Sequence, residues 1–201
     1  MMELIGWVVW LVPALSIWAA LAQWAWWREK NKKEELLRLN RELYHKAIID
    51  DLTGVYNVRY LHLKLREFVQ RARRYGRPFV LAWIDLDCFK QYNDTFGHLA
   101  GDQVLKTFGS VCQEQLRIDV DFAFRYGGDE FALLLAEVSR KEGEQIMERL
   151  QNAFKQAVDY KVGLSYGLVE YQNNFTPEDM LRTADELMYQ QKKQHKAILG
   201  K

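Results

Sequence analysis

The chain has 201 residues and a formal net charge of +1, and its length fits one globular domain with an appendage. A net charge this small gives no argument for a nucleic-acid partner, and we expect none. Its two cysteines, Cys88 and Cys112, form neither a disulfide framework nor a metal-ligand spacing, which favours a reducing compartment.

The first segment, Leu4 to Trp27, carries no charged residue, and as a helix it would be about 36 Å long, enough to cross a bilayer. Six of the seven tryptophans lie in it, and they gather toward its ends as in interfacial aromatic belts. A basic cluster follows at once, which by the positive-inside rule places the rest of the chain in the cytoplasm. We therefore predict that residues 1–27 form a single-pass anchor in the lipid bilayer of the cytoplasmic (inner) membrane.

Two other interpretations of this segment are weaker. Ala20-Leu21-Ala22 mimics a signal-peptide cleavage site, but no basic residue precedes the apolar run and a basic cluster follows it. A helix lying on the membrane surface would need a polar face, and none is visible.

Residues 28–49 are charged and helical in character. Leu36, Leu39, Leu43 and Ala47 recur at heptad-like spacing, which suits either an amphipathic helix that packs on its own domain or a short parallel coiled coil between two copies. The stripe is too short to decide between the two.

From Asp50 the chain has the pattern of a compact α/β unit, residues 50–201. The continuous apolar run Phe79–Ile84 predicts a central strand buried on both faces. Further strands are predicted over Phe122–Tyr126, Phe131–Leu135 and Val162–Leu168, and helices over Val58–Tyr75, Gly101–Leu116, Arg140–Ala157 and Pro177–Lys193. The order βαββαβ with flanking helices predicts an α+β fold with a ferredoxin-like, palm-type core.

Two aspartates, Asp85 and Asp87, follow the central strand at its carboxyl end, where open α/β sheets tend to expose ligand-binding groups. Because side chains alternate along a strand, both would point to the same face. An isolated Asp-x-Asp is more often a solvated turn. A divalent metal is the alternative, since it would offset the cost of burying the charges.

Polar residues farther along the chain suit a nucleotide. Lys90 can meet a phosphate as a point charge, and Asn93 with Asp102 offers the amide and carboxylate groups that the edge of guanine requires, although both residue types also cap helices. Lys192 and Lys196 stand four apart on one helix face and could hold a triphosphate, although lysines near a helix C-terminus also complement its dipole.

The most informative segment is Gly127-Gly128-Asp129-Glu130-Phe131. Its two glycines allow a tight turn, two carboxylates follow, and the chain then returns into an apolar strand. Carboxylates beside an open backbone turn suit a divalent metal and a phosphate-bearing substrate. Gly-Gly before an acid is common turn chemistry, so this interpretation depends on the surrounding residues.

Taken together, these segments resemble the GGDEF family of diguanylate cyclases over about residues 50–196. The resemblance is carried by Asp50–Asn57, Asp85–Asp102, Arg125–Phe131, Ser165–Gly167 and Ala184–Lys196. It implies an enzyme that condenses two GTP molecules into cyclic di-GMP and releases pyrophosphate, by metal-assisted attack of a 3′-hydroxyl across a homodimer.

The resemblance also implies roles for single residues. Asp85, Asp129 and the backbone carbonyl of Leu86 would coordinate Mg²⁺, with Mn²⁺ as an alternative ion. Asp129 would help to deprotonate the 3′-hydroxyl, and Glu130 would shape the site. Asn93 and Asp102 would read guanine, and the remaining substrate contacts would come from Lys90, Lys192, Lys196, Gly128 and the backbone of Cys88 and Phe89.

The sequence departs from the family in a few places. In the inhibitory product site Arg-x-x-Asp, Ile118 takes the arginine position and only Asp121 matches, so we expect this site to be degenerate. Lys196 stands where an arginine is usual and lacks its bidentate fork. Val58 and His195 also differ from the commoner residues.

One rival function has a recognisable mark in the sequence. A catalytically weak regulator that binds GTP or cyclic di-GMP on the same fold would be expected to lose Asp85 or Asp129, and both are present.

Overall fold

The computed structural model describes the backbone of residues 2–158 and 162–199, with side chains from residue 18 onward except at a few positions that include 196. The chain divides into two compact units, residues 1–47 and 48–201. Helix α1 (Met2–Ile48) accounts for the first. In the part of the chain that the structure describes, no helix has both the length and the apolar character needed to cross a membrane. The predicted anchor falls mostly on positions 1–17, whose side chains lie outside the described set.

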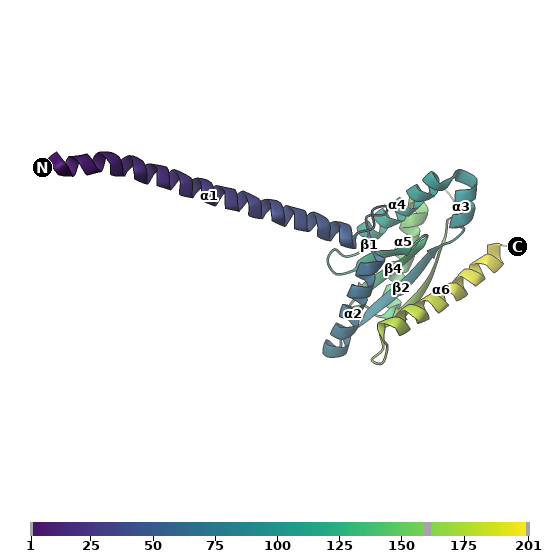
Figure 1. Ribbon diagram of the computed structural model, residues 1–201. Coiled ribbons are helices and arrows are strands. Elements are labelled where there is room, and N and C mark those ends of the chain that lie inside the picture. The colour runs from purple at the N-terminus through teal and green to yellow at the C-terminus, as the bar shows by residue number, and fades with distance from the viewer. Residues whose placement is uncertain (1, 159–161, 200–201) are drawn as a thin grey trace. The chain divides into compact units, whose positions relative to one another are not determined.

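The second unit alternates helices and strands along the chain (Figure 1). Its helices are α2 (Val58–Tyr75), α3 (Phe89–Phe96), α4 (His98–Gln115), α5 (Arg140–Ala157) and α6 (Pro177–Leu199). Its strands are β1 (Tyr56–Asn57), β2 (Phe79–Leu86), β3 (Phe122–Gly127), β4 (Glu130–Ala136) and β5 (Leu164–Glu170).

The strands form one sheet in the order β1-β3-β4-β2-β5. Strand β2 is central and pairs antiparallel with both β4 and β5, and β3 pairs antiparallel with β4. This order and direction are those of a ferredoxin-like core, so the predicted α+β fold is confirmed. The short β1 adds to the edge in parallel with β3 and makes the sheet mixed.

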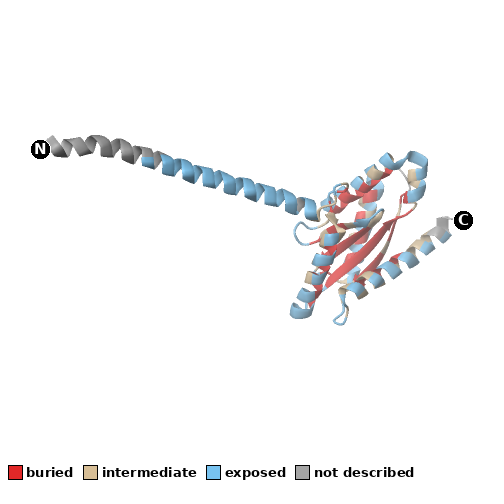
Figure 2. Cartoon of the chain, viewed as in Figure 1, coloured by how far each residue is buried: buried red, intermediate tan, exposed pale blue. Residues whose placement is uncertain are grey.

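Helices cover both faces of the sheet (Figure 1), α4 and α5 on one and α2 and α6 on the other. All of β2 is buried, as the red strands in Figure 2 show, which confirms the strand predicted from its apolar run. Its side chains alternate between two cores, Val80, Ala82, Ile84 and Leu86 in one and Phe79, Leu81 and Trp83 in the other.

The structure differs from the predicted elements near turns. Residues 89–96 form helix α3, which the sequence pattern did not predict, and Gly97, at φ 86°, separates it from α4. A glycine can end one helix and begin the next at this backbone angle, so α4 starts at His98 instead of Gly101. Strand β5 is shifted two residues along, α6 continues to Leu199, and β1 is too short to produce a periodic pattern.

We predict that Phe108→Ala lowers the free energy of unfolding by about 3–5 kcal/mol, because deleting a buried ring leaves a cavity. Phe108 is fully buried in α4, with its ring centroid 4.7 Å from that of Phe131 and 5.1 Å from that of Phe154. Urea denaturation measures the change. The matched control on the same helix is Leu99→Ala, since Leu99 is 87% exposed, and equal effects of the two substitutions would contradict the packing described here.

Candidate active site

Two buried carboxylates mark the carboxyl end of β2. Asp85 is 5% exposed and Asp87 7% exposed, and both contact α6, so they point to the same face as the alternation predicts. In the sheet, Asp85 stands between Glu130 of β4 and Ser165 of β5. Buried carboxylates need partners, and the partners found here define the site.

Lys192 of α6 is the cation that faces Asp85. Its Nζ lies 2.6 Å from Oδ1 and 2.5 Å from Oδ2 of that carboxylate. Burial raises the pKa of Asp85, Lys192 opposes the rise, and the charges of Asp129 and Asp87 add to it. For Lys192, burial acts to lower the pKa, but the hydrogen bond and charge of Asp85 outweigh it and the pKa is raised. The lysine therefore stays charged and is held by the acids.

The glycine-rich hairpin brings the next two acids to this point. The backbone turns at Gly128, where φ is 55°, and the Leu86 N–H donates to the Asp129 carbonyl at 3.2 Å. Arg125 fixes the tip, since its Nε and Nη2 donate to the Gly128 carbonyl at 3.1 and 2.8 Å. The same guanidinium pairs with Asp50 at 3.2 Å, so the start of the domain is tied to the hairpin.

Glu130 adds a further negative charge. Burial raises its pKa, and Asp85, Asp129 and Asp185 raise it further. Lys192 lowers it by a smaller amount. The site therefore holds several carboxylates that repel one another and one lysine that offsets only part of the repulsion.

The donor set fits a hard divalent cation. Carboxylate and carbonyl oxygens are the ligands of Mg²⁺, which usually takes only one or two carboxylates and completes its shell with water and substrate phosphates. Among the described residues, no three His, Cys, Asp or Glu side chains are grouped as a ready-made metal cage. Asp85 and Asp129, with the backbone at Leu86, are therefore suited to an ion that arrives together with a phosphate.

A helix begins directly beside these acids. Cys88 takes the left-handed conformation at φ 61°, and no side chain caps the start of α3. The first N–H groups of a helix have no intrahelical partner and favour an anion. Phe89 and Lys90 stand in this first turn. The predicted phosphate-binding backbone and Lys90 therefore follow Asp85 within five residues of the sequence.

Asn93 of α3 packs against Gly101 of α4. The amide oxygen of Asn93 lies so close to Gly101 that a Cβ there would stand 1.8 Å from it, and Asp102 is the next residue. Among the described residues this buried oxygen has no hydrogen-bond partner. A buried acceptor left unpaired costs about 1–3 kcal/mol, which a ligand that donates to it would recover.

The remaining predicted positions are Lys196 and the two residues of the degenerate product site, Ile118 and Asp121. The side chain of Lys196 lies outside the described residues. Asp121 is 8% exposed and already occupied, because Arg117 Nε and Nη2 donate to its two oxygens at 2.8 Å each and the Ala136 N–H donates at 3.1 Å. Ile118, at the expected arginine position, is 84% exposed. The single matching acid is thus committed to internal partners.

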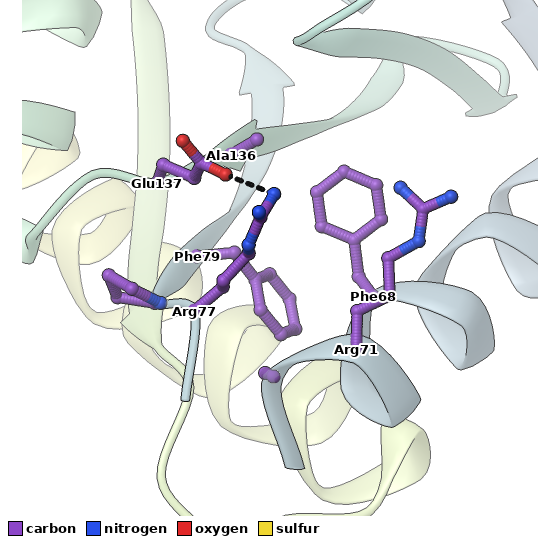
Figure 3. Close-up of a pocket in the computed structure, with 8 residues that line it drawn as sticks. Phe68, Arg71, Arg77, Phe79, Ala136 and Glu137 are labelled. Carbon is purple, nitrogen blue, oxygen red and sulfur yellow. Dashed lines mark hydrogen bonds and ion pairs between the residues drawn. The ribbon is translucent and has the colours of Figure 1, made fainter. Parts of the chain in front are cut away.

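A separate shallow pocket lies at the other end of β2 (Figure 3). Phe68 and Phe79 line it, and an ion pair of 2.8 Å between Arg77 and Glu137 borders it. Phe79 is the first residue of β2 and Asp85 is the last but one, so the pocket and the acidic site are roughly 20 Å apart along the strand. This pocket is not part of the acidic site.

Several contacts at the site had no prediction from the sequence. Ser165 belongs to the Ser-x-Gly motif and His195 differs from the commoner family residue, and both hydrogen-bond to Asp87, at 2.6 and 3.0 Å. The signature motif alone predicts no role for Arg125, which binds the Gly128 carbonyl and Asp50. These contacts cannot be predicted from local sequence patterns, because the residues of each pair are far apart in the chain and only the tertiary fold brings them together.

The fold and the site define an α+β domain with ferredoxin-like strand order and an acidic cluster at the end of its central strand. The family model for "Diguanylate cyclase, GGDEF domain" matches residues 47–197. The chain belongs to this GGDEF family.

The similar curated proteins include a diguanylate cyclase and a response regulator. The chain is 37% identical over 154 residues to the diguanylate cyclase DgcP of Pseudomonas aeruginosa, covering 74% of this chain and 23% of that protein. It is 36% identical over 168 residues to the response regulator PleD of Caulobacter vibrioides, covering 77% and 36%. The chain thus spans well under two thirds of the length of these curated relatives.

Solved structures agree with the fold. The diguanylate cyclase SiaD of Pseudomonas aeruginosa, in complex with its activator SiaC, has a TM-score of 0.72 at 33% identity, covering 83% of this chain and 66% of that chain. The coiled coil and GGDEF domain of DgcB from Caulobacter crescentus, in complex with c-di-GMP, has a TM-score of 0.74 at 26% identity, covering 83% and 93%.

The raised pKa of Glu130 predicts that its ionisation weakens the folded state. Because the folded pKa lies above the ordinary value of 4.5, the stability given by the protonated form is complete below that value and is lost as pH rises through the folded pKa. We expect Glu130→Gln to unfold at higher urea concentration than wild type at pH 7, with the difference shrinking toward pH 4.

Glu186→Gln is the control for that experiment, since Glu186 is exposed on α6 and its substitution should shift neither the midpoint nor its pH dependence. A Glu130→Gln protein less stable than wild type at pH 7 would contradict the mutual repulsion of the acids.

Proposed function

We propose that the chain is a diguanylate cyclase, which joins two GTP molecules into cyclic di-GMP and releases pyrophosphate. The observation that carries the proposal is the meeting of Asp85, Asp129 and Lys192 at the end of β2, beside the uncapped start of α3. The family match and the names of the similar proteins support the same reaction.

The residues of the site divide the work of handling a nucleoside triphosphate. Lys90 and Lys192 would neutralise phosphate charge, together with Lys196, and the N–H groups at Cys88 and Phe89 would approach the phosphates. A divalent ion, Mg²⁺ or Mn²⁺, held by Asp85, Asp129 and the Leu86 carbonyl, would supply electrostatic stabilisation of the charge that develops on phosphate oxygens.

The reaction also needs a base and a reader of the purine. Asp129 would accept the proton of the 3′-hydroxyl, and Glu130 would maintain the shape and charge of the site. Asn93, which packs against Gly101, and Asp102, the next residue of α4, would bind the guanine edge, where an amide and a carboxylate match its acceptors and donors.

Two copies of the chain would be required, because one domain holds one GTP and the product contains two. Leu36, Leu39 and Leu43 of α1 are more than half exposed, and pairing with a second copy would cover these side chains. The DgcB structure is described as a coiled coil and GGDEF domain, which supports a parallel pairing of residues 28–49 that raises the effective concentration of the two domains.

A membrane anchor formed by residues 1–27 remains part of the proposal. Its support is the uncharged, tryptophan-rich run from Leu4 to Trp27 and the basic cluster that follows. The catalytic domain would then lie on the cytoplasmic side of the inner membrane, with lipid around the first helix.

We predict that the purified chain converts GTP and Mg²⁺ into cyclic di-GMP, and that Asp129→Ala lowers the rate at least about 100-fold, because the general base is lost. Chromatography of the products measures both. The control is Asp119→Asn, an exposed position at φ 59° where asparagine is also tolerated; it should retain the wild-type rate. Wild-type dimers that form no product, or an Asp129→Ala protein as active as wild type, would contradict the proposal.

Base selection gives an independent prediction. Asp102→Ser should reduce the preference for GTP over ATP by about 10-fold or more, because serine cannot accept the paired N1 and N2 hydrogens that a carboxylate accepts. Competition between the two nucleotides, measured as a ratio of kcat/KM, tests it, with Asp94→Ser on the exposed side of α3 as control. An unchanged ratio in Asp102→Ser would remove the residue from guanine recognition.

A further inference from the structure

The second aspartate of β2 has an environment that the proposed reaction does not explain. Asp87 is buried, and its side chain contacts β5 and α6. Ser165 Oγ donates to Oδ1 at 2.6 Å, and His195 Nδ1 lies 3.0 Å from Oδ2 and 3.1 Å from Ser165 Oγ. These three side chains form a closed group, the Asp87–Ser165–His195 cluster.

The chemistry of the cluster fixes how the histidine is held. A carboxylate only accepts hydrogen bonds, so Nδ1 of His195 must carry the hydrogen and donate it to Asp87. A buried carboxylate with two donors is satisfied, whereas loss of either donor leaves an oxygen unpaired. The space is closely fitted as well, since a Cβ on Gly163 would stand 2.9 Å from Asp87 Oδ2.

The cluster joins the two segments that would grip the triphosphate. Asp87 lies between Leu86 and Cys88, whose backbone is proposed to approach metal and phosphate. His195 lies three residues after Lys192, hence on nearly the same face of α6 and about 4.5 Å farther along its axis. The hydrogen bond between Asp87 and His195 therefore connects the segment at residues 86–88 to helix α6, the two segments that are proposed to contact the phosphates.

The contacts of α6 with β5 show that Lys192 is held from both sides. Helix α6 is in close backbone contact with β5 at Gly167, where a Cβ would stand 2.0 Å from the Ala184 carbonyl oxygen. Next along the helix, Gln191 Oε1 accepts the Tyr166 N–H at 2.5 Å. His195 then reaches Ser165, so Lys192 lies between the contacts made by Gln191 and His195.

We propose that His195 is a positioning residue for GTP binding: through Asp87 and Ser165 it fixes the end of α6, and with it Lys192, against the loop that follows β2. This inference deepens the proposed cyclase activity and rests on it for the identity of the ligand. It assigns a role to a position where the sequence departs from the commoner family residue.

The first test measures affinity without turnover. Calorimetry with α,β-methylene GTP and Mg²⁺ gives the dissociation constant for wild type, His195→Ala and Ser165→Ala of the full chain. We expect each substitution to weaken binding by about 10-fold, the size typical of supporting residues around a binding site. His195→Asn should restore most of the affinity, because its side-chain N–H lies near the position of Nδ1. Gln194→Ala, an exposed neighbour in the same helical turn, should bind as wild type.

A double-mutant cycle separates positioning from simple loss of stability. If His195 acts through Lys192, then His195→Ala should have little further effect on affinity in a Lys192→Met protein, so the two changes are not additive. Additive effects, or an unchanged dissociation constant in His195→Ala with only a lower melting temperature, would overturn the positioning role. If His195→Ala does not fold, the dissociation constants of Ser165→Ala and His195→Asn, measured by the same calorimetry, test the positioning role instead.

The outcomes also separate this inference from the proposed function. A wild-type chain that binds the analogue but forms no cyclic di-GMP would refute the cyclase activity alone, and the affinities of the variants would still decide on His195. A wild-type chain that does not bind the analogue would refute both.

Discussion

The site depends on holding like charges together at the buried end of one strand. Asp85 is almost fully buried, the charge of Asp129 raises its pKa, and the charges of Asp85 and Asp129 raise the pKa of Glu130. Lys192 sits against both oxygens of Asp85 and makes this arrangement tolerable. One lysine cannot neutralise three carboxylates, so the site keeps a net negative charge. This charge favours the binding of a divalent cation, which in turn can bind phosphates.

Rigid elements maintain this unfavourable arrangement. The central strand is fixed by antiparallel partners on both sides and by cores on both faces. Arg125 holds the carbonyl of Gly128 and so prevents the hairpin tip from moving its acids apart. Helix α6 lies directly on β5 because Gly167 has no side chain to keep it away. The free energy gained by packing these elements offsets the repulsion at their shared edge.

Much of this could be predicted from the sequence because its signals are local. The apolar run of β2, the helix Val58–Tyr75 and the glycine hairpin are patterns within a few residues, and the structure has them where the patterns predict. Helix α3 could not be predicted, because a helix of eight residues between a left-handed Cys88 and Gly97 is too short to show a clear periodicity. The contact of Lys192 with Asp85 and the Asp87–Ser165–His195 cluster join residues far apart in the chain, and only the tertiary fold brings these together.

The central claim is that the acids at the end of β2 hold a metal ion together with a triphosphate. Electron paramagnetic resonance of Mn²⁺ in the presence of α,β-methylene GTP tests it most directly, since free and bound Mn²⁺ give different signals. The account predicts that bound Mn²⁺ rises when the nucleotide is added to wild type and that Asp85→Asn abolishes this rise, while Asp94→Asn on the surface leaves it unchanged. Equal Mn²⁺ binding by Asp85→Asn and wild type would contradict it.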